Sequence, residues 1–179
     1  MSGFLSQSGG ALGSKIVWYI TLALSLLLSG CGYRLAVHES LKGRSVAVPV
    51  FANKTLRPNL ESCLTAKVVD RFAGSGGATV VKSDQAELAL TGTILAYNES
   101  ASGFTADDKV AMYQLSMTVE AALRQVSNGA VIWKGTLRAV QDYPTSSDLA
   151  LKINAQEAAL RELCRKLAES IERESGNRF

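Results

Sequence analysis

Residues 110–143 read VAMYQLSMTVEAALRQVSNGAVIWKGTLRAVQDY, which is the pattern of a long antiparallel β-hairpin. Five polar residues of the first half share one phase of alternation, with largely apolar residues opposite them: Gln114, Ser116, Thr118, Glu120 and Arg124. This alternation predicts a strand over 110–126 that buries one face and exposes the other. The tetrapeptide Ser127-Asn128-Gly129-Ala130 contains Asn-Gly, which favours a type I′ turn, and a second strand is expected to return over 131–143.

Upstream of the hairpin, the pattern predicts one strand followed by one helix. Residues 44–51 alternate and are rich in β-branched side chains, which favours a strand, and Pro49 indicates an edge or a bulge because proline has no N–H. After a loop over 52–57, Pro58 suits the first turn of a helix over 58–73. Residues at the spacing of one helical face recur along it: Leu60, Cys63, Leu64, Val68 and Phe72.

The remaining segments supply two further strand candidates and a long helix. A short apolar run covers 78–82, and a longer strand is expected over 87–98, followed by a polar connection over 99–109. Pro144 ends the hairpin, and the polar residues after it offer a helix cap. The last helix is expected over 149–174, with an apolar face made of Leu149, Ile153, Leu160, Leu163, Leu167 and Ile171.

This order of elements predicts a single α+β domain over residues 44–174. We expect two helices packed on one face of a roughly four-stranded sheet that is mostly antiparallel or mixed. Residues 31–43 are expected to form a polar tether, and residues 175–179 a loose C-terminal tail.

The first 31 residues have the organisation of a bacterial lipoprotein signal peptide. One cation, Lys15, precedes an uncharged apolar run over 16–28, which is too short to span a bilayer and suits the apolar region of a secretory signal. The run ends in Leu28-Ser29-Gly30-Cys31, which resembles the box where a lipoprotein peptidase cleaves. We expect residues 1–30 to be removed and Cys31 to carry acyl chains such as palmitate; an uncleaved N-terminal anchor is the alternative.

The residue after the acylated cysteine indicates the destination of such lipoproteins. It is Gly32 here, whereas an Asp at this position commonly retains a lipoprotein in the inner membrane. By this resemblance we expect a lipid-anchored protein on the periplasmic side of the outer membrane, which is an oxidising compartment. Cys63 and Cys164 lie on predicted helices. They form a disulfide if the two helices are neighbours, and two buried free cysteines are the alternative.

Charge and motif content argue against nucleic-acid binding and against catalysis. The chain has 179 residues and a net charge of +3, and loss of Lys15 leaves 18 basic against 16 acidic side chains, scattered rather than clustered. His38 is the one histidine, and no phosphate loop, dinucleotide fingerprint or nucleophile elbow occurs. Asp107-Asp108 is interpreted as solvated, and the glycines at 74–77 as a helix stop. We therefore expect that the protein is not an enzyme and that it holds no cofactor and no metal ion.

Five segments follow the lipoprotein box in order: CGYRL at 31–35, VAVPVFANKT at 46–55, LTGTI at 90–94, YQLSMTV at 113–119, and the last helix. Together they resemble the lipopolysaccharide-assembly lipoprotein family, LptE, over nearly all of the mature chain. The segment at 46–55 alone also resembles outer-membrane lipoproteins of the curli-secretion-pore type and related periplasmic activators.

The resemblance implies a partner and a ligand. It implies that the protein sits as a plug inside LptD, the β-barrel that inserts lipopolysaccharide into the outer membrane, and supports barrel assembly and lipopolysaccharide delivery to the cell surface. A polar-faced sheet suits a polar barrel lumen. The alternative is a component or activator of another envelope machine, of the secretion-pore or wall-synthase type. A periplasmic hydrolase that depends on His38 is a third hypothesis.

The resemblance also implies two lipopolysaccharide-binding positions. A family lysine at the start of the last helix matches Lys152, within Leu149-Ala150-Leu151-Lys152. A family arginine lies in the connection before the Tyr-Gln strand; this chain has no arginine there, and Lys109 is its one cation, closer to the strand. For both lysines the alternative is an ordinary solvated side chain.

Overall fold

The computed structural model describes residues 41, 43–74 and 77–176. All of them belong to the second of two compact units of the chain, His38–Phe179. The predicted signal peptide, Cys31 and most of the tether lie outside the described residues. Leu41 is buried and belongs to the hydrophobic core, so packing begins before Arg44, within the segment predicted to be tether.

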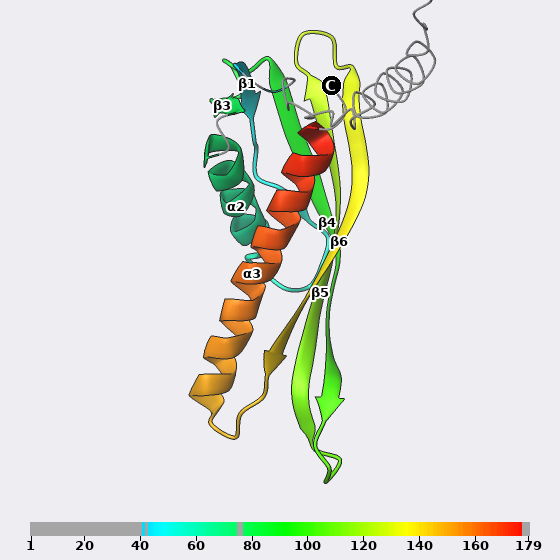
Figure 1. The fold of residues 1–179 in the computed structure, drawn as a ribbon. Coiled ribbons are helices and arrows are strands. Elements are labelled where there is room, and N and C mark those ends of the chain that lie inside the picture. Colours follow the sequence, from blue (N-terminus) through cyan, green and yellow to red (C-terminus); the bar gives the residue numbers. More distant parts are fainter. Residues whose placement is uncertain (1–40, 42, 75–76, 177–179) are drawn as a thin grey trace, which may run out of the picture. The chain divides into compact units, whose positions relative to one another are not determined.

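A six-stranded mixed sheet forms one layer of the domain (Figure 1). Three long strands, β4, β5 and β6, pair antiparallel in that order, and β1 and β2 pair parallel with β4 while β3 pairs parallel with β1. The α+β class and the mixed sheet are confirmed, and the estimate of four strands was too low. The strands are β1 Arg44–Ala47, β2 Ala52–Asn53, β3 Ala78–Val80, β4 Leu88–Phe104, β5 Val110–Gln125 and β6 Val131–Pro144.

The strand predicted over 44–51 ends early, and a second short strand, β2, lies in the segment predicted to be a loop over 52–57. β1 ends at Ala47, Pro49 lies in the connection, and β2 pairs with β4 further along at Ala52↔Thr93. The connection buries Phe51, whose backbone N–H donates to Thr65 Oγ1 at 3.0 Å. An alternating pattern therefore continued across a break in the backbone pairing, which the residue types alone do not reveal.

The polar connection predicted over 99–109 is mostly strand. β4 continues to Phe104 because β5 continues to pair with it, from Glu99↔Leu115 to Phe104↔Val110. A tight turn then closes on Lys109, whose carbonyl accepts from the Thr105 N–H at 2.8 Å. Strand pairing in this part outweighs low intrinsic strand propensity.

The predicted hairpin between β5 and β6 is present, but its turn is not type I′. Residues 126–129 span the turn between Gln125 and Ala130, whose backbone groups hydrogen-bond at 2.9 Å. Gly129 has φ +72°, whereas Asn128 does not have the positive φ that a type I′ turn requires at both central residues. The Asn128 side chain instead accepts from the Ala130 N–H at 3.0 Å.

Two helices, α2 Leu60–Gly74 and α3 Leu149–Gly176, cover the same face of the sheet (Figure 1). The α3 cap is Asp148, whose carboxylate accepts from the N–H groups of Ala150 and Leu151 at 2.8 and 3.2 Å. The helix runs to Gly176, and both Ser175 and Gly176 are buried. The predicted loose tail is therefore wrong for these two residues, and 177–179 lie outside the described residues.

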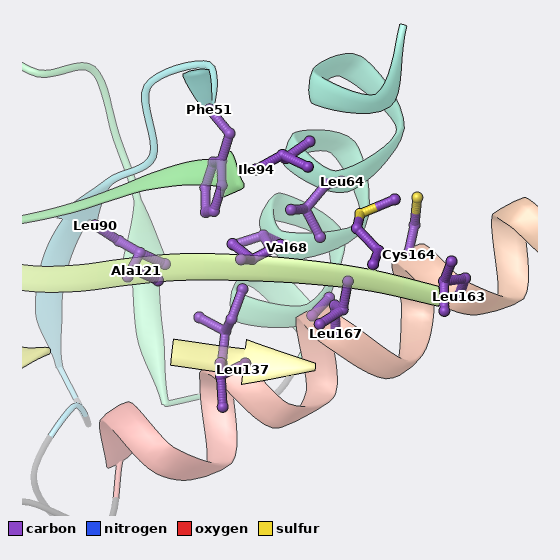
Figure 2. Close-up of a cluster of buried hydrophobic side chains, with 14 of the residues drawn as sticks. Phe51, Leu64, Val68, Leu90, Ile94, Ala121, Leu137, Leu163, Cys164 and Leu167 are labelled. Carbon is purple, nitrogen blue, oxygen red and sulfur yellow. The ribbon is translucent and has the colours of Figure 1, made fainter. Parts of the chain in front are cut away.

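The core lies between this inner face of the sheet and the two helices (Figure 2). The predicted α2 face is buried at Leu60, Leu64, Val68 and Phe72. The predicted α3 face is buried only from its middle onward, because Leu149 and Ile153 are 69% and 48% exposed. Fully buried side chains from the other elements include Phe51, Leu90, Ile94, Leu115, Val119, Leu163 and Leu167.

A disulfide joins the two helices. The Cys63 and Cys164 sulfurs are 2.20 Å apart and the Cα atoms 6.2 Å apart, across 101 residues of sequence. The Cα separation is within the ordinary range for disulfides. Of the two alternatives left open by the sequence, the structure therefore contains the bonded pair, which fixes α2 beside α3.

Candidate functional site

A polar and aromatic cluster lies between the first half of α3 and the inner face of the sheet. We call it the tyrosine layer, and its members are Glu99, Tyr113, Tyr143, Lys152 and Gln156. Strand register creates it, since Tyr113 pairs with Tyr143 across β5 and β6. Their rings stack with centroids 5.6 Å apart, and the Lys152 ammonium lies 4.7 Å from the Tyr113 centroid.

Glu99 links this layer together from β4. Its carboxylate accepts from the Tyr143 hydroxyl and, at 2.5 Å, from the Gln156 side-chain amide on α3. Burial, followed by the hydrogen bond to Glu99, raises the pKa of the Tyr143 phenol well above its usual value. The Tyr143 hydroxyl therefore stays protonated and donates its hydrogen bond to the Glu99 carboxylate.

The start of α3 and the turn between β4 and β5 lie at the same end of the domain (Figure 1), and each contains one of the two predicted lysines. Lys152 is in the first turn of α3, and its N–H donates to the Asp148 carbonyl at 3.0 Å. Lys109 closes the β4–β5 turn and is exposed. It precedes Tyr113 by four strand residues, roughly 13 Å along the strand, so the two lysines occupy one end without a described contact between them.

The same end exposes large apolar side chains. Leu149 is 69%, Leu151 60% and Phe104 62% exposed. Cations beside exposed apolar groups are the features that an amphiphile with anionic groups and acyl chains requires. Neither helix among the described residues has the length and apolar content needed to cross a membrane. We call this region, made of Phe104, Lys109, Leu149, Leu151 and Lys152, the α3-start end.

Neither of the two described helices, α2 and α3, lies on the opposite, outer face of the sheet (Figure 1). Alternation along the paired strands places small polar and charged residues on it. Glu120 and Lys134, from β5 and β6, form an ion pair at 3.0 Å. The exposed or half-buried polar residues of the outer face include Thr91, Thr93, Asn98, Thr118, Glu120, Arg124, Lys134, Thr136 and Arg138. The apolar residues Ala96 and Val140 lie among them.

A second cluster lies beside the tyrosine layer, around Arg57. The Arg57 guanidinium pairs with Glu157 at 3.2 Å and lies 5.3 Å from the centre of the Tyr97 ring. The Tyr97 hydroxyl is buried and, within the part of the chain that the structure describes, has no hydrogen-bond partner. Burial raises the pKa of this phenol, partly offset by Arg57. An unpartnered buried hydroxyl costs about 1–3 kcal/mol.

Substituting Tyr97→Phe is therefore expected to leave the protein as stable or to raise its free energy of unfolding by about 1 kcal/mol. The ring and its contact with Arg57 remain, while the unpartnered hydroxyl is removed. Urea unfolding of the full chain measures the change. Tyr143→Phe is the matched control and should destabilise, because that hydroxyl has a partner in Glu99. A loss of stability in Tyr97→Phe equal to that in Tyr143→Phe would show that the Tyr97 hydroxyl does have a stabilising partner.

The structure separates the other predicted site residues. Cys31 and His38 lie outside the described residues. Asp107 and Asp108 are exposed in the β4–β5 turn. Among residues 41, 43–74 and 77–176, no group of His, Cys, Asp and Glu is arranged to hold a metal ion. The tyrosine layer was missed by sequence reasoning, since its members are spread over four elements; the aligned tyrosines of β5 and β6 were the available signal.

Comparisons with known proteins agree with this fold. A family model described as "LptE: Lipopolysaccharide-assembly" matches residues 43–175. No curated protein matches the chain. Similar solved structures include protein XCC0632 from Xanthomonas campestris, at 17% identity and TM-score 0.54, covering 72% of this chain and 83% of that one. A putative lipoprotein from Caulobacter crescentus has 15% identity and TM-score 0.51, covering 71% and 88%. Rare lipoprotein B from Shewanella oneidensis has 20% identity and TM-score 0.50, covering 72% and 91%.

Proposed function

This chain belongs to the LptE lipopolysaccharide-assembly family, and on that basis we propose that it is a non-enzymatic outer-membrane lipoprotein that plugs a lipopolysaccharide-inserting β-barrel of the LptD type. In that position it supports folding of the barrel and delivery of lipopolysaccharide to the outer leaflet. Cys31 carries the acyl chains that hold it at the membrane. Incorporation of labelled palmitate into the full chain, and its loss in a Cys31→Ser variant, tests the anchor.

The polar outer face of the sheet is the observation that carries this proposal. Neither α2 nor α3 covers this face, and it carries threonines and the Glu120–Lys134 ion pair, which suits contact with a polar surface. The lumen of an outer-membrane barrel is polar, because its strands direct their apolar residues outward to lipid. We assign the outer face to the barrel wall and the helices to the side away from it.

Depletion of the protein tests this role in cells. Without its plug, the barrel is expected to be scarce or misfolded and surface lipopolysaccharide to fall. Restoring the full chain from a plasmid should restore both. Normal barrel levels and normal surface lipopolysaccharide after depletion would contradict the proposal.

We assign lipopolysaccharide contact to the α3-start end. Lys152 and Lys109 supply cations for the phosphates, and Phe104, Leu149 and Leu151 supply apolar contact for acyl chains. A charge-assisted hydrogen bond contributes about 1.5–3 kcal/mol, which corresponds to tenfold or more in affinity.

Lys152→Ala is expected to weaken binding of purified lipopolysaccharide by about tenfold, and Lys109→Ala by less, since it lies in an exposed turn. Lys82→Ala is the charge-matched control, because Lys82 is exposed and lies outside this end. Binding of fluorescent lipopolysaccharide to the full chain measures all three. Equal losses in Lys152→Ala and Lys82→Ala would assign the effect to overall charge.

A further inference from the structure

The loop between β2 and α2 exposes a leucine side chain, Leu56, to solvent. Leu56 is fully exposed, at 104% of its reference area. The loop around it is nevertheless pinned by Asn53. The Asn53 amide nitrogen donates to the Arg57 carbonyl and to Glu61 Oε2, both at 2.8 Å, and its oxygen accepts from the N–H and hydroxyl of Thr55 at 2.9 and 2.8 Å.

The hydrogen bonds that hold this loop lower the entropy cost of binding a partner at Leu56. Single exposed apolar side chains are common on protein surfaces and need no explanation alone. Here the backbone on both sides of Leu56 is already ordered, so a partner that covers this side chain loses little conformational entropy on binding. Rigid presentation is a property of binding anchors.

A second leucine meets the first in one groove. Leu95 is the extra residue of a β-bulge between Ile94 and Ala96, and it is 41% exposed. Bulges redirect side chains. Leu56 and Leu95 line the same open groove, of about 600 Å³, whose remaining lining is Lys54, Thr55, Arg57, Ala96 and Tyr97. Two independent local structures, the hydrogen-bonded loop and the β-bulge, thus place leucine side chains in the same groove.

The groove also has a definite charge. Its positive charge comes from Lys54, which is exposed, and no carboxylate lines the groove. Arg57 also borders the groove, but its guanidinium is paired with Glu157 at 3.2 Å. Pairing of β2 with β4 ends beside it, where the Lys54 N–H donates to the Ile94 carbonyl at 3.0 Å. Within the described residues, β4 pairs only with β5 beyond this point, so an extended segment can enter the groove without displacing a strand.

We propose that this Leu56 groove, made of Lys54, Leu56, Arg57, Leu95 and Tyr97, is the docking site for a segment of the barrel partner in which an apolar side chain lies next to a carboxylate. The apolar side chain covers Leu56 and Leu95, and the carboxylate pairs with Lys54, since Arg57 is already paired with Glu157. This inference rests on the proposed function and adds a contact that is distinct from the outer face and from the α3-start end.

Site-specific photo-crosslinking in cells tests it with the full-length protein. A photoreactive residue is placed at Leu56, at Leu95, or at Arg138 on the outer face. Crosslinks to the barrel from Leu56 and Leu95 are expected. Crosslinks from Arg138 alone would overturn the Leu56 groove while leaving the proposed function intact. Absence of barrel crosslinks at all three positions would overturn both.

Point variants separate docking from folding. Leu56→Asp and Lys54→Glu should each lower the yield of the Leu95 crosslink by about fivefold while leaving the Arg138 yield unchanged. Both side chains are exposed, so the melting temperature should not move. Val131→Asp, at an exposed apolar residue of β6, is the matched control and should leave the Leu95 yield unchanged. An unchanged Leu95 yield in Leu56→Asp would contradict the inference.

Discussion

Replacing Gly92 by alanine should lower the free energy of unfolding by about 3 kcal/mol, because the space beside this glycine is already filled. A β-carbon at position 92 would lie 2.1 Å from Cε1 and 2.4 Å from Cδ1 of Phe51. Phe51 is 2% exposed, and its backbone is held to α2 through Thr65. The ring therefore has to leave its buried position, and loss of a buried phenylalanine costs about 3–5 kcal/mol.

Urea unfolding of the full chain in detergent measures this cost. Gly74→Ala is the matched control, because outside the adjacent residues and the backbone of its own helix no atom lies within 4 Å of a β-carbon there. Its effect should stay within about 1 kcal/mol. Adding Gly92→Ala to a Phe51→Ala chain should cost less than about 1 kcal/mol more, since the clash is gone. Equal effects at positions 92 and 74 would show that Phe51 does not fill the space.

Removing the disulfide should lower the free energy of unfolding by about 2–4 kcal/mol. Cys63 and Cys164 close a loop across 101 residues, so the bond strongly restricts the unfolded chain. In the folded state it also holds α2 against α3, where Cys164 is fully buried. Without the bond, local unfolding should consequently begin at the contact between the two helices.

Unfolding with and without a thiol reductant measures this effect. The double variant Cys63→Ala/Cys164→Ala should be as unstable as the reduced protein and should not respond to reductant. Mass spectrometry of unreduced peptides should find Cys63 joined to Cys164. Two free thiols in protein prepared from the periplasm, with stability indifferent to reductant, would contradict the bond.

Strong local patterns predicted the parts of the fold that rest on them. The alternation over 110–126 and the Asn-Gly turn located β5 and β6 to within a residue or two. The break at Ala47 and the extension of β4 to Phe104 were not predictable in this way. Both depend on which strand lies alongside, and pairing across the sheet is not encoded in the spacing of one segment.

The helices show the same division. The α2 face was predicted correctly because the whole helix packs on the core. The start of α3 has the same apolar periodicity at Leu149 and Ile153, yet it extends past the buried core onto the tyrosine layer, where these side chains face water. Periodicity predicts an apolar face but not whether anything in the same chain covers it.

Only those residues of the candidate site that lie in recognisable sequence motifs were predictable from the sequence. Family resemblance pointed to Lys152 and Lys109, and the structure places both at one end of the domain. The tyrosine layer joins residues from β4, β5, β6 and α3 and needs the register of all of them. The exposure of Leu56 is likewise a property of the folded loop, since a leucine between polar residues looks unremarkable in the sequence.

Gentle detergent extraction of outer membranes that contain the tagged full-length protein tests the central claim most directly. The chain should be recovered with one large β-barrel in an equimolar complex, and the complex should persist in the presence of lipopolysaccharide. Recovery of a ring built only from copies of this chain, or of the chain without any barrel, would contradict the plug role and assign the protein to another envelope machine.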